Sequence, residues 1–300
     1  MSSGSGEEKF PSERSADRSP DRSTDRSPDR SSEKPEKSQP EQTERQQASK
    51  DIVPLLKGWD YEPGTINVRK IDGRDGKPKL QMRLDLGLLQ MELTGRPDGA
   101  KPHGHDSLLE YYEEQLREHK KTNGSELGFH LTSNECQSLR EEAAMYYHRY
   151  LSLFVLEEFN GVVRDTDRNL RLLDLCGKYA LTQEDRIYLE QYRPYIIMMN
   201  VRAKASMLFN DKKWKQALEV VTEGLDSIRE FFARFGQVEA FGKSNEVKIL
   251  KKFARDIRKK LPVDPIQKLK AQLEKAVQRE AYEDAARLRD EIRRQTEEVE

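Results

Sequence analysis

The sequence predicts a mainly helical α+β protein in four parts: a disordered tail at 1–50, a small β element with one helix at 51–124, a helical domain at 131–262 and a helical hairpin at 263–300. Apolar residues recur every three or four positions through most of the C-terminal two thirds, which is typical of amphipathic helices. They alternate with polar residues only in a short stretch, at 65–95, which indicates strands. The first fifty residues show neither pattern.

The composition excludes several classes of function. Lysine and arginine number 53 and aspartate and glutamate 54, so the net charge is −1 and no strong field favours nucleic acid or acidic lipid as an obligate partner. No apolar run approaches about twenty residues, so no membrane span is expected, and no secretory signal pattern is present. We therefore expect a cytoplasmic protein. Cys136 and Cys176 are far apart in sequence, and neither a disulfide framework nor a cysteine zinc site is expected.

The N-terminal tail contains a four-residue repeat of the Asp-Arg-Ser-Pro type at 17–32. Such a segment cannot bury enough apolar surface to offset the entropy of ordering, so we expect disorder. Each arginine of the repeat follows an aspartate, which cancels the charge locally. This pattern favours a solvated tail over a phosphorylatable or RNA-binding arm.

The segment after residue 51 predicts a small antiparallel sheet of two or three strands. Residues 65–71 form one strand, and 80–86 alternate more cleanly. The apolar phase then reverses beyond Gly87. Because a one-residue slip sends every side chain to the other face, a bulge, bend or turn is required near Gly87 and Leu88.

His103, His105 and Asp106 resemble a set of metal ligands, but no third histidine or cysteine follows at a ligand spacing, so we predict no metal site. The residues read instead as a turn that ends in a helix cap at Asp106 or Ser107. A helix from residue 108 to about 121 follows. No phosphate loop, GxGxxG, HExxH or GxSxG motif is present, so no cofactor and no catalytic residues are predicted. Acid pairs such as Glu141 with Glu142 and Asp165 with Asp167 are expected on solvated helix faces.

The helical domain contains an internal repeat. When its two copies are superposed, Phe159 falls on Trp214, Val162 on Ala217 and Leu170 on Leu225. Each copy is a helix, a short polar turn, an aromatic residue and a second helix, which resembles the tetratricopeptide (TPR) unit. Pro194 falls within an apolar helical pattern and predicts a kink or a new helix start.

A further amphipathic helix at 245–260 carries the most basic surface of the chain, at 251–260. No aromatic residues are interleaved for base stacking, so a solvated face is favoured over a nucleic-acid patch.

The C-terminal segment predicts a short antiparallel helical hairpin. Asp264 can cap its first helix and Pro265 suits the first turn. One apolar stripe on the first helix contains Ile266, Leu269, Leu273, Ala276 and Val277. One on the second contains Tyr282, Ala285, Ala286, Leu288 and Ile292. Two helices this short cannot bury a core of their own, so the hairpin must dock on the rest of the chain, a second copy or another protein.

The sequence Tyr-Glu-x-Ala-Ala-x-Leu-Arg-Asp at 282–290, with the leucines that precede it, resembles the UVR motif. The UvrB and UvrC excision-repair subunits share that motif, and McsA-type regulators of a bacterial protein-arginine kinase also carry it. The resemblance implies a coiled-coil-like, protein-docking hairpin and no catalysis. The chain lacks the paired CxxC motifs of McsA-type proteins and the motor and nuclease motifs of the repair subunits. The expected protein-binding residues are Leu269, Leu273, Tyr282, Ala285, Ala286, Leu288, Arg289, Asp290 and Ile292, with Arg289 and Asp290 fixing register.

These observations together predict a non-enzymatic adaptor that docks proteins through the hairpin and a TPR-like surface. Self-association through the hairpin and packing of the hairpin on its own domain are open alternatives. A DNA-repair accessory that binds DNA through 251–260 is another. The last is an enzyme with an unrecognised site around Arg83, Asp85, His103 and His105.

Overall fold

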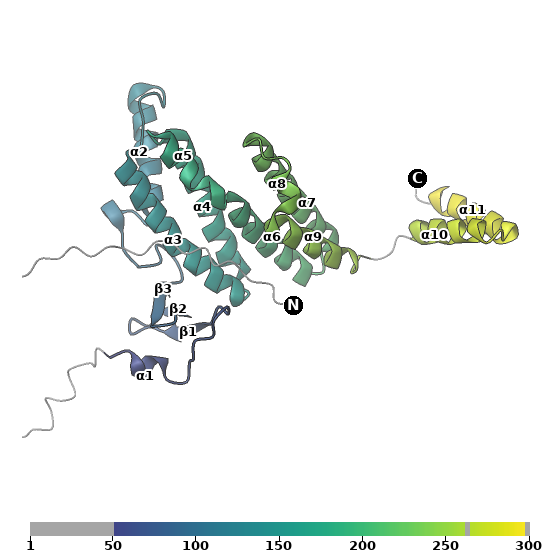
Figure 1. The fold of residues 1–300 in the computed structure, drawn as a ribbon, viewed down its shortest axis with the longest axis horizontal. Coiled ribbons are helices and arrows are strands. Elements are labelled where there is room, and N and C mark those ends of the chain that lie inside the picture. The colour runs from purple at the N-terminus through teal and green to yellow at the C-terminus, as the bar shows by residue number, and fades with distance from the viewer. Residues whose placement is uncertain (1–50, 262–264, 298–300) are drawn as a thin grey trace, which may run out of the picture. The chain divides into compact units, whose positions relative to one another are not determined.

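The computed structural model describes residues 51–261 and 265–297, and the predicted tail at 1–50 lies outside the described residues. The described chain is mainly helical with one three-stranded antiparallel sheet, which confirms the predicted fold class. Long helices follow one another in a stack after the sheet (Figure 1). The last two helices, α10 and α11, form a hairpin.

The sheet has the order β1-β2-β3, with β1 at Val68–Asp72, β2 at Pro78–Arg83 and β3 at Leu88–Glu92. The predicted reversal of phase is confirmed as a tight turn, in which the Leu84 N–H donates to the Gly87 carbonyl at 2.9 Å. The turn also shortens the strand predicted at 80–86. Leu86 therefore lies at the turn tip and is 88% exposed, not on the buried face where alternation placed it.

The two faces of the sheet have different partners. Leu80, Met82 and Met91 pack into the main core with Tyr150 of the first long helix. The other face carries a polar ladder in which Arg69 donates to Gln81 and Gln81 to Gln90. Trp59 covers this ladder, since the Arg69 guanidinium lies 4.0 Å from the centre of its ring. Trp59 follows the one-turn helix α1, Val53–Leu56.

Helix α2, Leu108–Asn123, begins at the predicted cap, because the Ser107 hydroxyl accepts the Glu110 N–H at 3.2 Å. The turn before it includes the 3₁₀ segment η1, Pro102–Gly104. The His103 ring stacks on Tyr111 of α2 with centroids 4.2 Å apart, and His105 lies 5.4 Å from the same ring.

The stack consists of five long helices that pack in chain order: α3 at Ser133–Val155, α4 at Phe159–Tyr179, α6 at Arg193–Asn210, α7 at Trp214–Arg234 and α9 at Asn245–Arg258. Short helices connect them: α5 at Gln183–Tyr188, η2 at Glu190–Tyr192 and α8 at Ala240–Lys243. Pro194 stands at the start of α6, which confirms the predicted helix start and suits proline because the first helical N–H groups need no partner there. The stack therefore contains two antiparallel helical hairpins, α3–α4 and α6–α7, which we call the inner hairpins.

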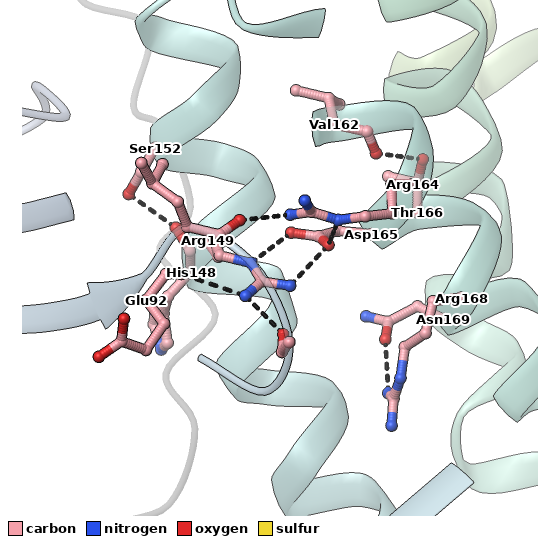
Figure 2. A network of polar contacts seen from close by, with 12 residues as sticks. Glu92, His148, Arg149, Ser152, Val162, Arg164, Asp165, Thr166, Arg168 and Asn169 are labelled. Carbon is pink, nitrogen blue, oxygen red and sulfur yellow. Dashed lines mark hydrogen bonds and ion pairs between the residues drawn. The ribbon is translucent and has the colours of Figure 1, made fainter. Parts of the chain in front are cut away.

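A buried ion pair joins the two helices of the first hairpin, and its arginine also bonds the end of the sheet (Figure 2). Arg149 of α3 donates two hydrogen bonds to Asp165 of α4, at 2.7 and 2.8 Å. Its third nitrogen donates to the carbonyls of Glu92 and Gly95, at 3.1 and 2.7 Å. Asp165 and Glu142 are fully buried, so their prediction as solvated residues was wrong, whereas Glu141 and Asp167, the other members of the two pairs, are exposed as predicted. Each is held by arginine, Glu142 by Arg168, which offsets the cost of burying the carboxylate.

The two cysteines, remote in sequence, are neighbours in the structure. Cys136 lies in the first turn of α3 and Cys176 in the last turn of α4, and both are buried in a second apolar cluster with Leu139 and Leu172. The interaction between the two thiols lowers the pKa of Cys136 and raises the pKa of Cys176. They therefore belong to the core of the α3–α4 hairpin.

Candidate protein-docking hairpin

The C-terminal hairpin consists of α10, Pro265–Gln278, and α11, Tyr282–Glu297. Its turn is built by Glu280, which has a left-handed φ of 57°. The Ala281 N–H donates to the Ala276 carbonyl at 2.9 Å, and the Glu280 N–H donates to the Val277 carbonyl at 3.0 Å. These two bonds are those of a Schellman helix end, which satisfies the last carbonyls of α10 and reverses the chain.

One side of each helix in the hairpin is shielded by the other helix. On α11 the shielded residues repeat every three or four positions, and Ala285 is the most buried at 9% exposure. On α10 they follow the same spacing. The shielded residues are Leu269, Leu273, Ala276, Ala281, Ala285, Leu288 and Ile292. This spacing is that of two helices packed along one apolar seam.

Other apolar residues of the hairpin face solvent. Tyr282 is 69% exposed and Val277 is 52% exposed, one on each side of the turn, and Ala286 is exposed one helical turn beyond Tyr282. We refer to Val277, Tyr282 and Ala286 as the turn-end surface. Arg289 and Asp290 are also exposed and lie 3.6 Å apart, Nε to Oδ1.

The residues expected to bind a partner are therefore divided between two faces. Ala285, Leu288 and Ile292 hold α11 on α10, with Leu269 and Leu273 opposite, whereas Tyr282, Ala286, Arg289 and Asp290 are available to a partner. Sequence reasoning placed all the apolar residues of α11 on one stripe. It also placed Val277 among the inner residues of α10, where the structure exposes it.

The turn of this hairpin repeats the turns of the two inner hairpins. Glu157 and Lys212 have φ values of 58° and 59°, as Glu280 does. The next residue in each case donates five positions back, Glu158 to Leu153 and Lys213 to Leu208, both at 2.8 Å. An aromatic residue then opens the second helix in all three, namely Phe159, Trp214 and Tyr282. The predicted superposition of Phe159 on Trp214 thus extends to Tyr282.

In the inner hairpins, the following helix covers the residues at the turn end. Phe154, the counterpart of Val277, contacts Phe159 and lies under the Arg202 guanidinium of α6, 4.4 Å from its ring centre. Phe209 lies 6.3 Å from Phe253 of α9, ring centre to ring centre. Phe159 and Trp214 both pack against the main core. Within the described part of the chain, no comparable side chain covers Val277 and Tyr282, which keep more than half of their surface exposed.

Residues of the alternative enzymatic site serve two separate local structures. Arg83 donates to the carbonyls of Trp59 and Gly87, at 2.9 and 2.8 Å, and closes the β2–β3 turn. The Asp85 carboxylate accepts the Leu86 N–H in the same turn. The two histidines lie against Tyr111 instead, with His103 stacked on its ring and His105 tilted to it. Residues 51–261 and 265–297 contain no cluster of His, Cys, Asp and Glu able to hold a metal ion. Among these same residues, no helix combines the length and apolar character that crossing a bilayer requires.

A comparison with known protein families finds a match in the hairpin segment. The family model of the UvrB/uvrC motif matches residues 264–294, which confirms the resemblance drawn from the sequence. The match covers α10 and most of α11 and leaves the sheet and the helical stack outside it. No curated protein and no solved structure matches the chain. The likeness of the α3–α4 and α6–α7 hairpins to TPR units stays a prediction.

Proposed function

We propose that this protein is a non-enzymatic adaptor that docks a partner protein through the turn-end surface of its UVR hairpin. The supporting observation is that Val277 and Tyr282 are exposed, whereas in both inner hairpins a following helix lies against the counterpart of Val277 and the counterpart of Tyr282 packs against the main core. An exposed tyrosine beside an aliphatic residue and a small one is typical of a binding hot spot, because an aromatic ring buries much apolar area at little entropic cost. The partner would place a helix across this surface.

A second docking surface, along the TPR-like helices, is part of the proposal. This second surface has less support than the hairpin. Met198 and Met199 of α6 are buried in the core and are not available to a partner. A stacked pair of helical hairpins still offers a rigid support for a terminal docking element. Catalysis is not part of the proposed function.

Affinity capture from native lysate tests the proposal, comparing the full chain with a chain that ends at Leu261. We expect at least one protein that the full chain retains and the shortened chain loses. If both chains capture the same proteins, the hairpin packs within the molecule and the proposal fails. Self-association is the remaining alternative, and sedimentation of the purified full and shortened chains tests it. A dimer that only the full chain forms would indicate self-association.

A further inference from the structure

A second surface lies on α9, far in sequence from the hairpin turn. Six cations of this helix and its C-cap form what we call the cationic face: Lys248, Lys251, Lys252, Arg255, Arg258 and Lys259. At 100° per residue they fall within an arc of about 120°. All six are exposed, while the neighbouring arc, Val247, Leu250, Ala254 and Ile257, is buried against the helical stack. The two arcs give α9 its strong amphipathicity.

Charges on α9 are segregated rather than mixed. Its two carboxylates, Glu246 and Asp256, project outside the arc of the cationic face. Asp256 pairs with Lys259 at 2.8 Å, and the Lys251 ammonium lies 5.3 Å from the centre of the Phe241 ring. In the described part of the chain, the other four cations have no ion-pair partner. The face thus keeps a net positive charge.

This segregation is unfavourable for the isolated helix. Lys248 and Lys252 are four residues apart, as are Lys251 and Arg255, and like charges at that spacing repel. The helix dipole favours cations in the last turn, which accounts for Arg258 and Lys259. It does not account for Lys248, Lys251 and Lys252, which precede the last turn. A solvated face would be equally soluble with charges of both signs.

We propose that the cationic face of α9 binds a short acidic helical segment of a partner protein. The face extends about 17 Å from residue 248 to residue 259, at 1.5 Å per residue. Carboxylates repeating every three or four positions on one side of a helix match a row of cations with the same spacing. This surface is separate from the turn-end surface and does not depend on the function proposed above.

Two other polyanions fit the face less well. Residues 245–260 hold seven lysines and arginines and two acidic residues, whereas the whole chain has a net charge of −1, so the remainder is net negative. A nucleic-acid duplex longer than the cationic face needs cations beyond it, and the rest of the chain offers no net positive charge, whereas a short acidic helix needs none. An acidic membrane is disfavoured because the apolar side of α9 is already buried and cannot enter a bilayer.

Fluorescence anisotropy on the full-length protein tests this proposal. The probe is a labelled helical peptide of about sixteen residues, long enough to cover the face, with glutamates at i, i+4, i+7 and i+11. A scrambled peptide of the same composition is the reference. We expect the patterned peptide to bind at least about tenfold more tightly, and raising the salt concentration to weaken its binding.

Charge reversal locates the site. K248E/K252E/R255E is expected to reduce affinity for the patterned peptide at least about tenfold. The matched control is K57E/K77E/K121E, which makes the same change of net charge at exposed lysines elsewhere and is expected to leave affinity unchanged. Circular dichroism confirms that both variants fold. Equal binding of the two peptides, equal loss in both variants, or tighter binding of a DNA duplex that the first variant alone loses would each overturn the proposal.

Discussion

At the level of single residues, the buried Arg149–Asp165 pair joins parts of the chain that are remote in sequence. Both side chains are 1% exposed. One guanidinium connects α3, α4 and the end of the sheet, because it bonds Asp165 and two backbone carbonyls. Such a pair fixes the arrangement more than it adds to stability, since desolvation offsets much of the attraction.

Removing one member of that pair is predicted to be costly. Asp165→Asn leaves the Arg149 charge buried without its counter-ion, and we expect a loss of about 3–5 kcal/mol in unfolding free energy. The control is Asp226→Asn, which breaks the exposed pair with Arg229 and is expected to cost less than about 1 kcal/mol. Urea denaturation of both variants measures the difference. Similar losses in the two would mean that the buried pair has no special role.

At the scale of elements, Asp185 fastens the start of α5 to the start of α3. Its carboxylate accepts hydrogen bonds from Ser133, Arg140 and Thr182, at 2.6, 2.7 and 2.7 Å. These bonds, led by that of Ser133, lower the pKa of Asp185 to about 2. In the unfolded chain the pKa is near the ordinary value of about 3.9.

This pKa difference predicts a dependence of stability on pH. The unfolded chain takes up a proton before the folded chain does, so the contribution of Asp185 is complete above about pH 4 and is lost as the pH falls towards 2. Asp185→Asn is expected to lower the melting temperature at neutral pH and to reduce its fall between pH 4 and 2. Thermal melting over that range measures both. An unchanged acid slope would show that the carboxylate is not protonated there.

Two adjacent alanines of α11 test which face of this helix packs against α10. Ala286 is exposed and Ala285 is buried against α10, so we expect different effects from the same change. Ala286→Glu should abolish partner binding with helix content nearly unchanged. Ala285→Glu should separate the two helices and lose helical signal by circular dichroism, because a carboxylate would be buried without a counter-ion. Equal behaviour of the two variants would contradict the assignment of faces.

At the scale of the whole molecule, one turn geometry recurs in three helical hairpins, and this recurrence was partly visible in the sequence. Phe159 and Trp214 could be superposed because an aromatic residue after a polar turn leaves a clear pattern. Tyr282 aligns with them through the left-handed turn residue and the hydrogen bond five positions back, which only the structure shows. The left-handed residue of each turn is glutamate or lysine, not glycine, and so gave no signal.

Burial of charge and the contacts of a helix face could not be predicted in the same way. Asp165 and Glu142 have the sequence context of solvated residues, and only the packing of α4 on α3 buries them. On α11, Ala285 and Ala286 differ by about 100° in direction, so an apolar stripe alone does not say which alanine faces α10. In both cases, the buried acids and the two alanines, the outcome depends on where the neighbouring helix packs. A single sequence does not give that position.

Docking at the turn-end surface is tested by the affinity of the captured partner for Tyr282→Ala, determined by calorimetry on the full-length protein. Tyr188→Ala is the control, because Tyr188 is also an exposed tyrosine, at 42%, and lies in α5. If Tyr282 anchors the docked helix, we predict a loss of at least about 2 kcal/mol in binding free energy for Tyr282→Ala and no change for the control. Unchanged affinity in Tyr282→Ala would contradict docking at the turn-end surface.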